Sequence, residues 1–326
     1  MKNKITCLLA GVALFGATAN AEIVLTDELS AYGYIDMALT DGEGNGNTAT
    51  SVAEFELGFS FTPAESKWSA VAELSFDDGD NNDVYDFETV TVSYQYSDAL
   101  SFTFGNILSY QGFETFDATG LYQFSYAGVS GTPLYTAAYA VGASADYTTG
   151  DYDFGLWVGD TAEAETSLEY LVAYNGIENL TLKFIYADDP SYETTNFWAS
   201  YDYNDFTFAV EYINNDFSNG DGTYSYGAVG TLYNGIDDVT ESEALVFMVY
   251  KAFGNAGLTF RYTDGEATAS GATNPAGLFG TAEYEKITIS PSYAFSDNVF
   301  GLLEYSEEDL EGVEETTLAA ELIYTF

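Results

Sequence analysis

The sequence predicts an all-β fold: a transmembrane, antiparallel, up-and-down β-barrel of about sixteen strands, with a long third external loop folded into the lumen. Three observations predict it. Apolar residues recur at every second position through most of the chain, as in strands with one apolar face. The links between these runs are short and long in turn. The final segment, residues 315–326, alternates down to a terminal aromatic residue.

The first 21 residues predict a secretory signal peptide. Two lysines precede an apolar core that ends near Ala17, and an A-x-A cleavage pattern ends at Ala21. A retained anchor helix is the alternative reading of this stretch. Cleavage leaves residues 22–326 as a single barrel domain and removes Cys7, the only cysteine, so the mature chain has no disulfide.

The charge and residue types exclude several functions. The mature chain carries five basic and 52 acidic residues, because the signal peptide removes two lysines and no acid. Nucleic acid and anionic surfaces would repel such a chain. The full sequence is 17% aromatic and 47% hydrophobic, which argues against disorder. Without His or mature Cys, most hydrolase triads and zinc sites are excluded, so we expect no enzyme, no cofactor and no metal.

The alternating runs have the length of bilayer-crossing strands, roughly 9–11 residues. We place strands at 30–40, 51–61, 67–76, 87–96, 100–105, 135–147, 152–159, 167–174, 180–186, 195–203, 206–213, 243–253, 257–263, 282–295, 299–305 and 315–326. Pro291 lies inside one strand, and alternation is weak in 299–305, so the count is least secure there. A soluble, secreted β-sandwich or solenoid is the alternative fold.

The connections fall into two classes. Seven short links contain Gly, Asn, Asp, Ser and Pro, as tight turns require. Eight long links alternate with them, which is typical of an outer-membrane barrel. The even strand count returns both termini to the periplasmic side.

The final strand resembles the C-terminal signature by which outer-membrane proteins are recognised for barrel assembly. The residues that carry this resemblance are Leu322, Tyr324 and Phe326. An ordinary amphipathic strand that happens to end at Phe is the alternative.

The alternation of apolar and polar residues is interrupted from Asn106 to Leu134. Loops of this length inside a regular architecture are usually functional or disordered, and this one is rich in aromatic residues and glycine, so we expect it to be ordered. If it folds into the barrel mouth it narrows the lumen. The residues expected at this constriction are Tyr110, Phe113, Glu114, Phe116, Asp117 and Tyr122.

Assigning the apolar rows to lipid places the charged residues in the lumen. The expected acidic residues there include Glu54, Glu56, Glu73, Glu169 and Glu211, and the expected basic wall is Lys183, Lys251, Arg261 and Lys286. The last three fall on consecutive strands and, opposite Glu114 and Asp117, would set a transverse field. Alternatively, scattered lysines merely neutralise nearby carboxylates. The acidic excess predicts a preference for cations.

The acidic stretch 77–83 allows two readings. Its oxygen ligands suit a hard divalent cation, although the spacing is not that of an EF-hand. A solvated acidic loop is the reading we prefer.

The chain resembles a Gram-negative outer-membrane porin, most closely β-barrel porins of the OmpL-like kind. The resemblance is carried by Ala31–Asp36, Phe102–Asn106, Gly112–Glu114, Leu121–Tyr126 and Tyr324–Phe326. It implies passive diffusion of small hydrophilic solutes, a third external loop inside the pore, a homotrimer, and an arginine cluster opposite the loop. Here one Arg and a few Lys stand in for that cluster.

We therefore expect a porin of the outer membrane whose partners are membrane lipid, small hydrophilic solutes, cations and the barrel-assembly machinery. One rival is a substrate-specific channel, for example for sugars, in which loop aromatics stack on the solute. Another is a non-conducting, surface-binding barrel. Outer-membrane phospholipases use a Ser–His pair, which this chain cannot supply.

Overall fold

A computed structural model describes residues 22–42, 49–77, 84–114, 117–128, 134–135, 139–160, 166–190, 192–217, 239–269, 280–310 and 312–326. The expected signal peptide and most of the acidic stretch 77–83 lie outside these ranges. Within the described ranges, no helix is long and apolar enough to cross a membrane.

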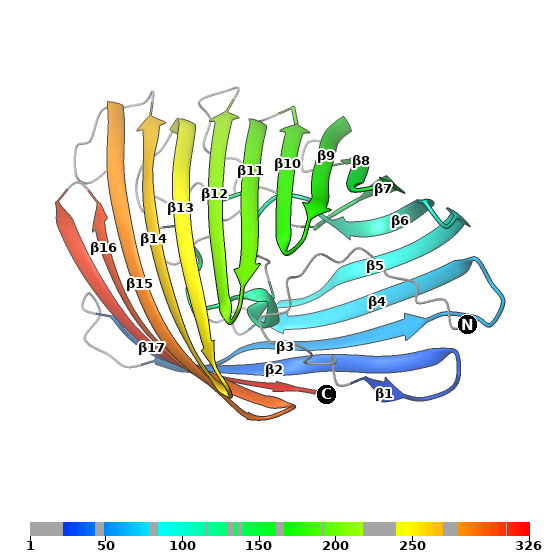
Figure 1. The fold of residues 1–326 in the computed structure, drawn as a ribbon, viewed down its shortest axis with the longest axis horizontal. Coiled ribbons are helices and arrows are strands. Elements are labelled where there is room, and N and C mark those ends of the chain that lie inside the picture. Colours follow the sequence, from blue (N-terminus) through cyan, green and yellow to red (C-terminus); the bar gives the residue numbers. More distant parts are fainter. Residues whose placement is uncertain are drawn as a thin grey trace.

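The described residues form sixteen long strands, and a two-residue strand precedes them. Figure 1 shows the long strands side by side in chain order around a barrel. Their bounds are β1 Ile23–Val24, β2 Leu29–Gly42, β3 Ala49–Phe61, β4 Trp68–Asp77, β5 Val84–Ser97, β6 Leu100–Leu108, β7 Tyr139–Thr149, β8 Tyr152–Asp160, β9 Thr166–Ile177, β10 Leu180–Asp188, β11 Tyr192–Tyr203, β12 Phe206–Phe217, β13 Val239–Phe253, β14 Ala256–Ala269, β15 Gly280–Ser296, β16 Val299–Leu310 and β17 Val313–Thr325.

The predicted strand count is confirmed, and most strands run longer than predicted. The predicted strand 257–263, for example, is β14 and continues to Ala269. Its extra residues are polar or small, and they stay paired with β15 up to Ala269 opposite Gly280. Alternation of apolar residues marks only the part of a strand that faces an apolar medium, so it underestimates the paired length. The predicted strand 135–147 is β7 and begins later, at Tyr139.

The sheet closes on itself. Each long strand pairs antiparallel with the next, and β17 pairs with β2, with Tyr324 opposite Ile35. Beyond β17, Phe326 and Gly33 exchange two backbone hydrogen bonds of 2.9 Å. The short β1 then continues along β2, with Ile23 opposite Ala31. Closure leaves no open edge between β17 and β2, as a strand structure in lipid requires.

The two positions where the count was least secure are both accommodated. Pro291 lies within β15 opposite Leu258 of β14. On its other side, the ladder to β16 pairs Ile289 with Tyr305 and resumes at Ser292 with Leu302. Proline has no N–H to donate, and the ladder lacks two residue pairs here before it resumes, so the hairpin of β15 and β16 is kept.

All short links lie at one end of the barrel. Most are two-residue turns, and several place a residue in the left-handed region that tight hairpins need. Gly254 has φ +67° and Asn204 has φ +53°. β2 begins and β17 ends at this same end, as the even strand count predicted.

The two faces of the barrel differ as predicted. Along β14, Leu258 and Phe260 point outward and are exposed, whereas Thr259, Arg261 and Thr263 point inward and are at most 1% exposed. An apolar outer face suits contact with lipid chains, and a polar inner face suits water and polar partners.

Candidate functional site

The segment between β6 and β7 is fastened to the inner wall of the barrel. Its first residues are held by Glu169 of β9, whose carboxylate accepts hydrogen bonds from the Ser109 hydroxyl (2.7 Å), the Tyr110 N–H (2.8 Å) and the Gln111 side-chain amide (3.2 Å). The Tyr110 hydroxyl donates to Asp146 of β7 at 2.6 Å. Glu169, expected to line the lumen, therefore serves as an acceptor for this segment.

The next residues are held by β11 and β12. The Gly112 N–H donates to Asn196 Oδ1 at 3.0 Å, and the Phe113 N–H donates to Glu211 Oε1 at 3.0 Å. Asn196 in turn donates to Glu211 at 2.8 Å. Glu211 is 3% exposed, so it too is occupied by the segment.

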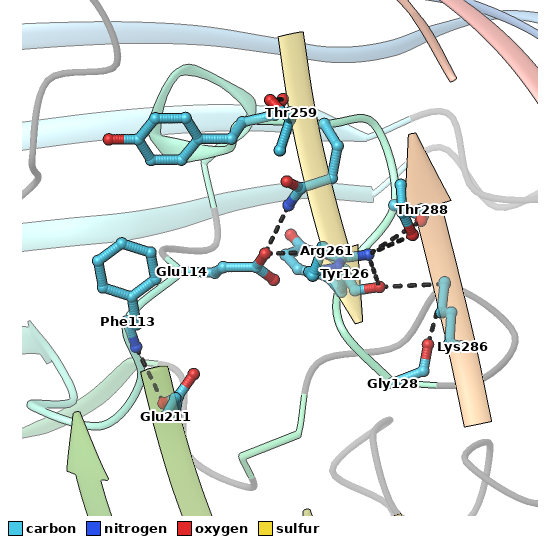
Figure 2. A network of polar contacts seen from close by, with 12 residues as sticks. Phe113, Glu114, Tyr126, Gly128, Glu211, Thr259, Arg261, Lys286 and Thr288 are labelled. Atoms are coloured by element: carbon cyan, nitrogen blue, oxygen red, sulfur yellow. Dashed lines mark hydrogen bonds and ion pairs between the residues drawn. The ribbon is translucent and has the colours of Figure 1, made fainter. Parts of the chain in front are cut away.

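Glu114 forms a buried ion pair with Arg261 of β14. The Arg261 Nη1 to Glu114 Oε1 distance is 2.6 Å, and the two side chains are 1% and 5% exposed. Arg261 Nη2 donates to the Tyr126 carbonyl at 2.7 Å. Lys286 of β15 donates to the carbonyls of Tyr126 (3.1 Å) and Gly128 (3.0 Å). Figure 2 shows both basic side chains directed at this segment. Charge-assisted bonds of this length are among the stronger ones in proteins.

Further inward side chains hold the second half of the segment. Glu304 of β16 accepts from the Ser125 N–H (2.9 Å) and hydroxyl (2.6 Å). The Thr259 hydroxyl donates to the Tyr122 carbonyl at 2.8 Å, and Asn215 donates to the Leu134 carbonyl at 3.1 Å. None of these residues could be recognised from the sequence as an anchor: Glu304 was predicted only to point into the lumen, and Thr259 and Asn215 look like any other polar residue on an inward face.

The aromatic residues of the segment pack against the wall. Phe113 meets Trp198 edge-on, with ring centroids 5.4 Å apart, and stacks with Tyr122 at 6.3 Å. Tyr122 lies 5.2 Å from Tyr250 and is 4% exposed. Its ring is therefore covered by protein and is not available to stack on a solute. Phe116, also expected at the constriction, lies outside the described residues.

The predicted basic wall is only partly assembled. Arg261 and Lys286 lie side by side on β14 and β15, and Lys183 points inward from β10, 5.0 Å from the centre of the Trp198 ring. Lys286 also pairs with Glu308 at 2.8 Å. Since Arg261 and Lys286 are covered by the segment that they bind, they do not face Glu114 across an opening.

Lys251 was wrongly placed on that wall. It shares a face with the exposed Phe247 and Phe253, so it points outward. Its amine lies 4.4 Å from the centre of the Phe206 ring and 3.0 Å from Asp205 in the adjoining short turn. A lysine near the end of a barrel strand reaches the polar interface, where a charge costs only about 0–1 kcal/mol. Strict exclusion of charge from the outer face was therefore too strong an assumption.

The opposite side of the interior carries carboxylates. No Lys or Arg occurs from residue 68 to 182, and Lys67 points away, donating to the Tyr96 carbonyl at 2.8 Å. The inward acids of β2–β5 form what we call the acidic wall: Asp36, Glu54, Glu56, Glu73 and Glu88. Glu73 accepts a hydrogen bond from the Tyr32 hydroxyl at 2.5 Å. The acids predicted in the lumen therefore fall into two groups. Glu169 and Glu211 accept hydrogen bonds from the segment, whereas Glu54, Glu56 and Glu73 lie on the acidic wall.

Glu88 was missed because of a β-bulge. The pairing of β4 with β5 shifts between Ala72 and Leu74, so alternation is interrupted where Glu88 lies. Asn106 stabilises the bulge by donating to the carbonyls of Phe87 (3.1 Å) and Glu88 (2.5 Å). The Phe87-Glu88-Thr89-Val90 sequence has two outward residues three apart, which is the only trace of the bulge in the sequence.

Asp117 extends the acidic wall from the segment. It directly precedes a 3₁₀ turn, η1, Ala118–Gly120. Burial, and then the charges of Glu54 and Glu73, raise the pKa of Asp117 to about 7, while the Tyr139 hydroxyl acts in the opposite direction. The fold therefore retains this proton more tightly than the unfolded chain, in which an Asp pKa is about 3.9.

We expect Asp117→Asn to stabilise the protein at pH 8 and to leave its stability nearly unchanged at pH 4. Above about pH 7 the native Asp117 is charged beside other carboxylates, so folding stability falls as pH rises between about 4 and 7. Urea unfolding of both proteins at the two pH values measures this. Comparing the two cancels the titration of other groups, and an equal gap at pH 4 and pH 8 would contradict the assignment.

Comparisons with known proteins show the fold. No protein-family model matches the chain, and no curated protein matches it significantly in sequence. Among solved structures, it is similar to the in-vitro folded outer-membrane protein OmpT of Vibrio cholerae (TM-score 0.67, 13% identity, 94% of this chain and 100% of that one). It is also similar to the outer-membrane channel DcaP of Acinetobacter baumannii, with a TM-score of 0.65 and 14% identity over 91% of this chain and 97% of that one. A third similar structure is Salmonella typhi OmpF in complex with daunomycin, with a TM-score of 0.65 and 14% identity over 94% of this chain and 100% of that one.

Proposed function

We propose that this chain is an outer-membrane porin, a passive diffusion channel for small hydrophilic solutes and ions that prefers cations. The observation that carries the proposal is the unequal use of charge inside the barrel. Arg261 and Lys286 are buried under the segment they bind, whereas the acidic wall has no basic residue on its own strands. Along a path between the two, the acidic wall would therefore supply most of the uncovered charge.

Elementary electrostatics then gives the selectivity. Ionised carboxylates are stable inside a barrel only if water or cations solvate them, because transfer of an unpaired charge to a dry interior is prohibitively costly. A ring or wall of one sign in a narrow aqueous path raises the local concentration of the opposite ion. The described residues between 109 and 135 are proposed to narrow this path, with Glu114 fixing their position and Asp117 adding a carboxyl group to the acidic wall.

The fold supports a role in the outer membrane. The structures to which the chain is similar include proteins described as an outer-membrane protein and an outer-membrane channel. One similar structure is the trimer form of OmpT of Vibrio cholerae. A homotrimer, export by the N-terminal signal and assembly through the terminal Phe326 belong to the same proposal.

The decisive experiment is reconstitution of the mature protein into a planar bilayer under a KCl gradient. We expect discrete conductance steps and a reversal potential displaced toward that of K⁺. Steps with anion preference would keep the porin and refute the selectivity. Correctly folded protein without steps would refute the channel and favour a surface-binding barrel, while saturable block of the current by a sugar would favour a substrate-specific channel.

An enzymatic role has less support. The chain has no His, and the acids with short side-chain contacts, such as Glu169 and Glu304, are used to hold the inner segment. The sugar-channel alternative also has less support, because the Tyr122 ring is covered by protein and cannot stack on a sugar.

A further inference from the structure

We propose that the acidic wall contains a binding site for a hard divalent cation of the Ca²⁺ type, formed by Glu54, Glu56 and Glu88 with Tyr34 and Asp36. One carboxylate oxygen from each of the three glutamates lies within 4.8 Å of the other two. Two ligands of one Ca²⁺ are separated by at most about 5 Å, twice its 2.3–2.6 Å bond length. The three oxygens are thus already spaced for a shared ion.

The backbone is built to bring these glutamates together. Glu54 and Glu56 lie on β3, and Glu88 lies on β5, two strands away. Bulges adjust both strands at this level: the β2–β3 pairing shifts between Asp36 and Met37, and the β4–β5 pairing shifts between Ala72 and Leu74. Bulges commonly re-aim side chains at functional sites.

An independent observation points to a ligand. Within the described part of the chain, the Tyr34 hydroxyl and Asp36 Oδ1 have no hydrogen-bond partner, although their side chains are only 4% and 3% exposed. Both face the cluster, because Tyr34 pairs directly with Glu56 and Asp36 with Glu54. Buried polar atoms are normally satisfied, and an exception calls for a partner such as a water or an ion.

The chemistry selects a hard cation. All the groups are oxygen donors, which favour Ca²⁺ and Mg²⁺ over softer metals. No lysine or arginine lies on β2–β5 to compete for the carboxylates. The donors come from several strands rather than from one compact octahedral cage, and this spread fits Ca²⁺ better than Mg²⁺. If the chain is the channel proposed above, the bound ion would also lower its cation preference.

Direct binding tests the site without reference to conduction. The refolded mature protein in detergent is titrated with Tb³⁺, a luminescent substitute for Ca²⁺, with excitation of tyrosine, and the signal is then displaced with Ca²⁺. We expect one saturable site, at least tenfold weaker in Glu56→Gln and in Glu88→Gln, and several-fold weaker in Tyr34→Phe. Far-ultraviolet circular dichroism establishes that each variant is folded.

Glu73→Gln is the matched control, because it removes the same charge from the same wall outside the cluster. It should bind within about twofold of the wild type. Equal weakening in all three glutamine variants would mean diffuse attraction and overturn the site, as would the absence of saturable binding to folded protein. Binding without conduction would leave this site standing and remove only the porin, and conduction without binding would do the reverse.

Discussion

Arg261→Gln is expected to lower the free energy of unfolding by about 3–5 kcal/mol, because it leaves the Glu114 carboxylate buried without its charged partner, with the neutral Gln123 amide still donating to it. It also removes the 2.7 Å bond to the Tyr126 carbonyl, so both ends of the segment 114–126 lose a contact with β14. If the chain is the channel proposed above, we also expect a noisier open-channel current in the planar bilayer, since a loosened segment would fluctuate inside the path. Urea unfolding and single-channel recording measure the two effects.

The Glu114→Gln/Arg261→Gln double variant separates charge from position. With both charges removed no ion is left buried, so it should recover most of the stability lost by Arg261→Gln alone. Lys251→Gln is the control for loss of a basic residue. The ion pair between Lys251 and Asp205 is exposed, so its loss should change the free energy of unfolding by only about 0–1 kcal/mol. The open-channel current of Lys251→Gln should equal that of the wild type. If Arg261→Gln is destabilised but its open-channel current is no noisier than that of the wild type, other contacts are enough to hold the segment in place.

The strands and their faces were predictable because a barrel strand in lipid obeys a two-residue period. Arg261 and Lys286 were correctly assigned to the inner face of adjacent strands on that basis. The period reports which face a residue occupies and nothing about its depth. This is why Lys251, at the end of β13, was assigned to the wrong face, and why the bulge at Glu88 was not seen.

The partners of the inner residues were not predictable. Glu211 and Glu56 both appeared as inward acids, but Glu211 holds the Phe113 N–H, whereas Glu56 lies on the acidic wall. The difference depends on where a segment about a hundred residues away in the sequence comes to rest. Likewise, adjacency on β14 and β15 indicated a basic wall, and only the placement of Glu114 and Tyr126 reveals that this wall is covered.

If the acidic wall sets the selectivity, Glu56→Lys combined with Glu73→Lys should reverse it. The double variant changes the charge of the wall by about four units without touching the bonds that hold the inner segment. We expect the reversal potential under a KCl gradient to change sign. The shift should be large at 0.1 M salt and smaller at 1 M, because the screening length falls from about 10 Å to about 3 Å.

Glu241→Lys combined with Glu285→Lys is the matched control, since both residues are exposed on the outer face and the total charge change is the same. If selectivity arises from the wall, the control keeps the cation preference of the wild type, because the outer charges are separated from the path by the barrel and screened by salt. Equal shifts in the two double variants would assign selectivity to the net charge of the whole molecule. The wall would then lose its role, even if the channel itself stands.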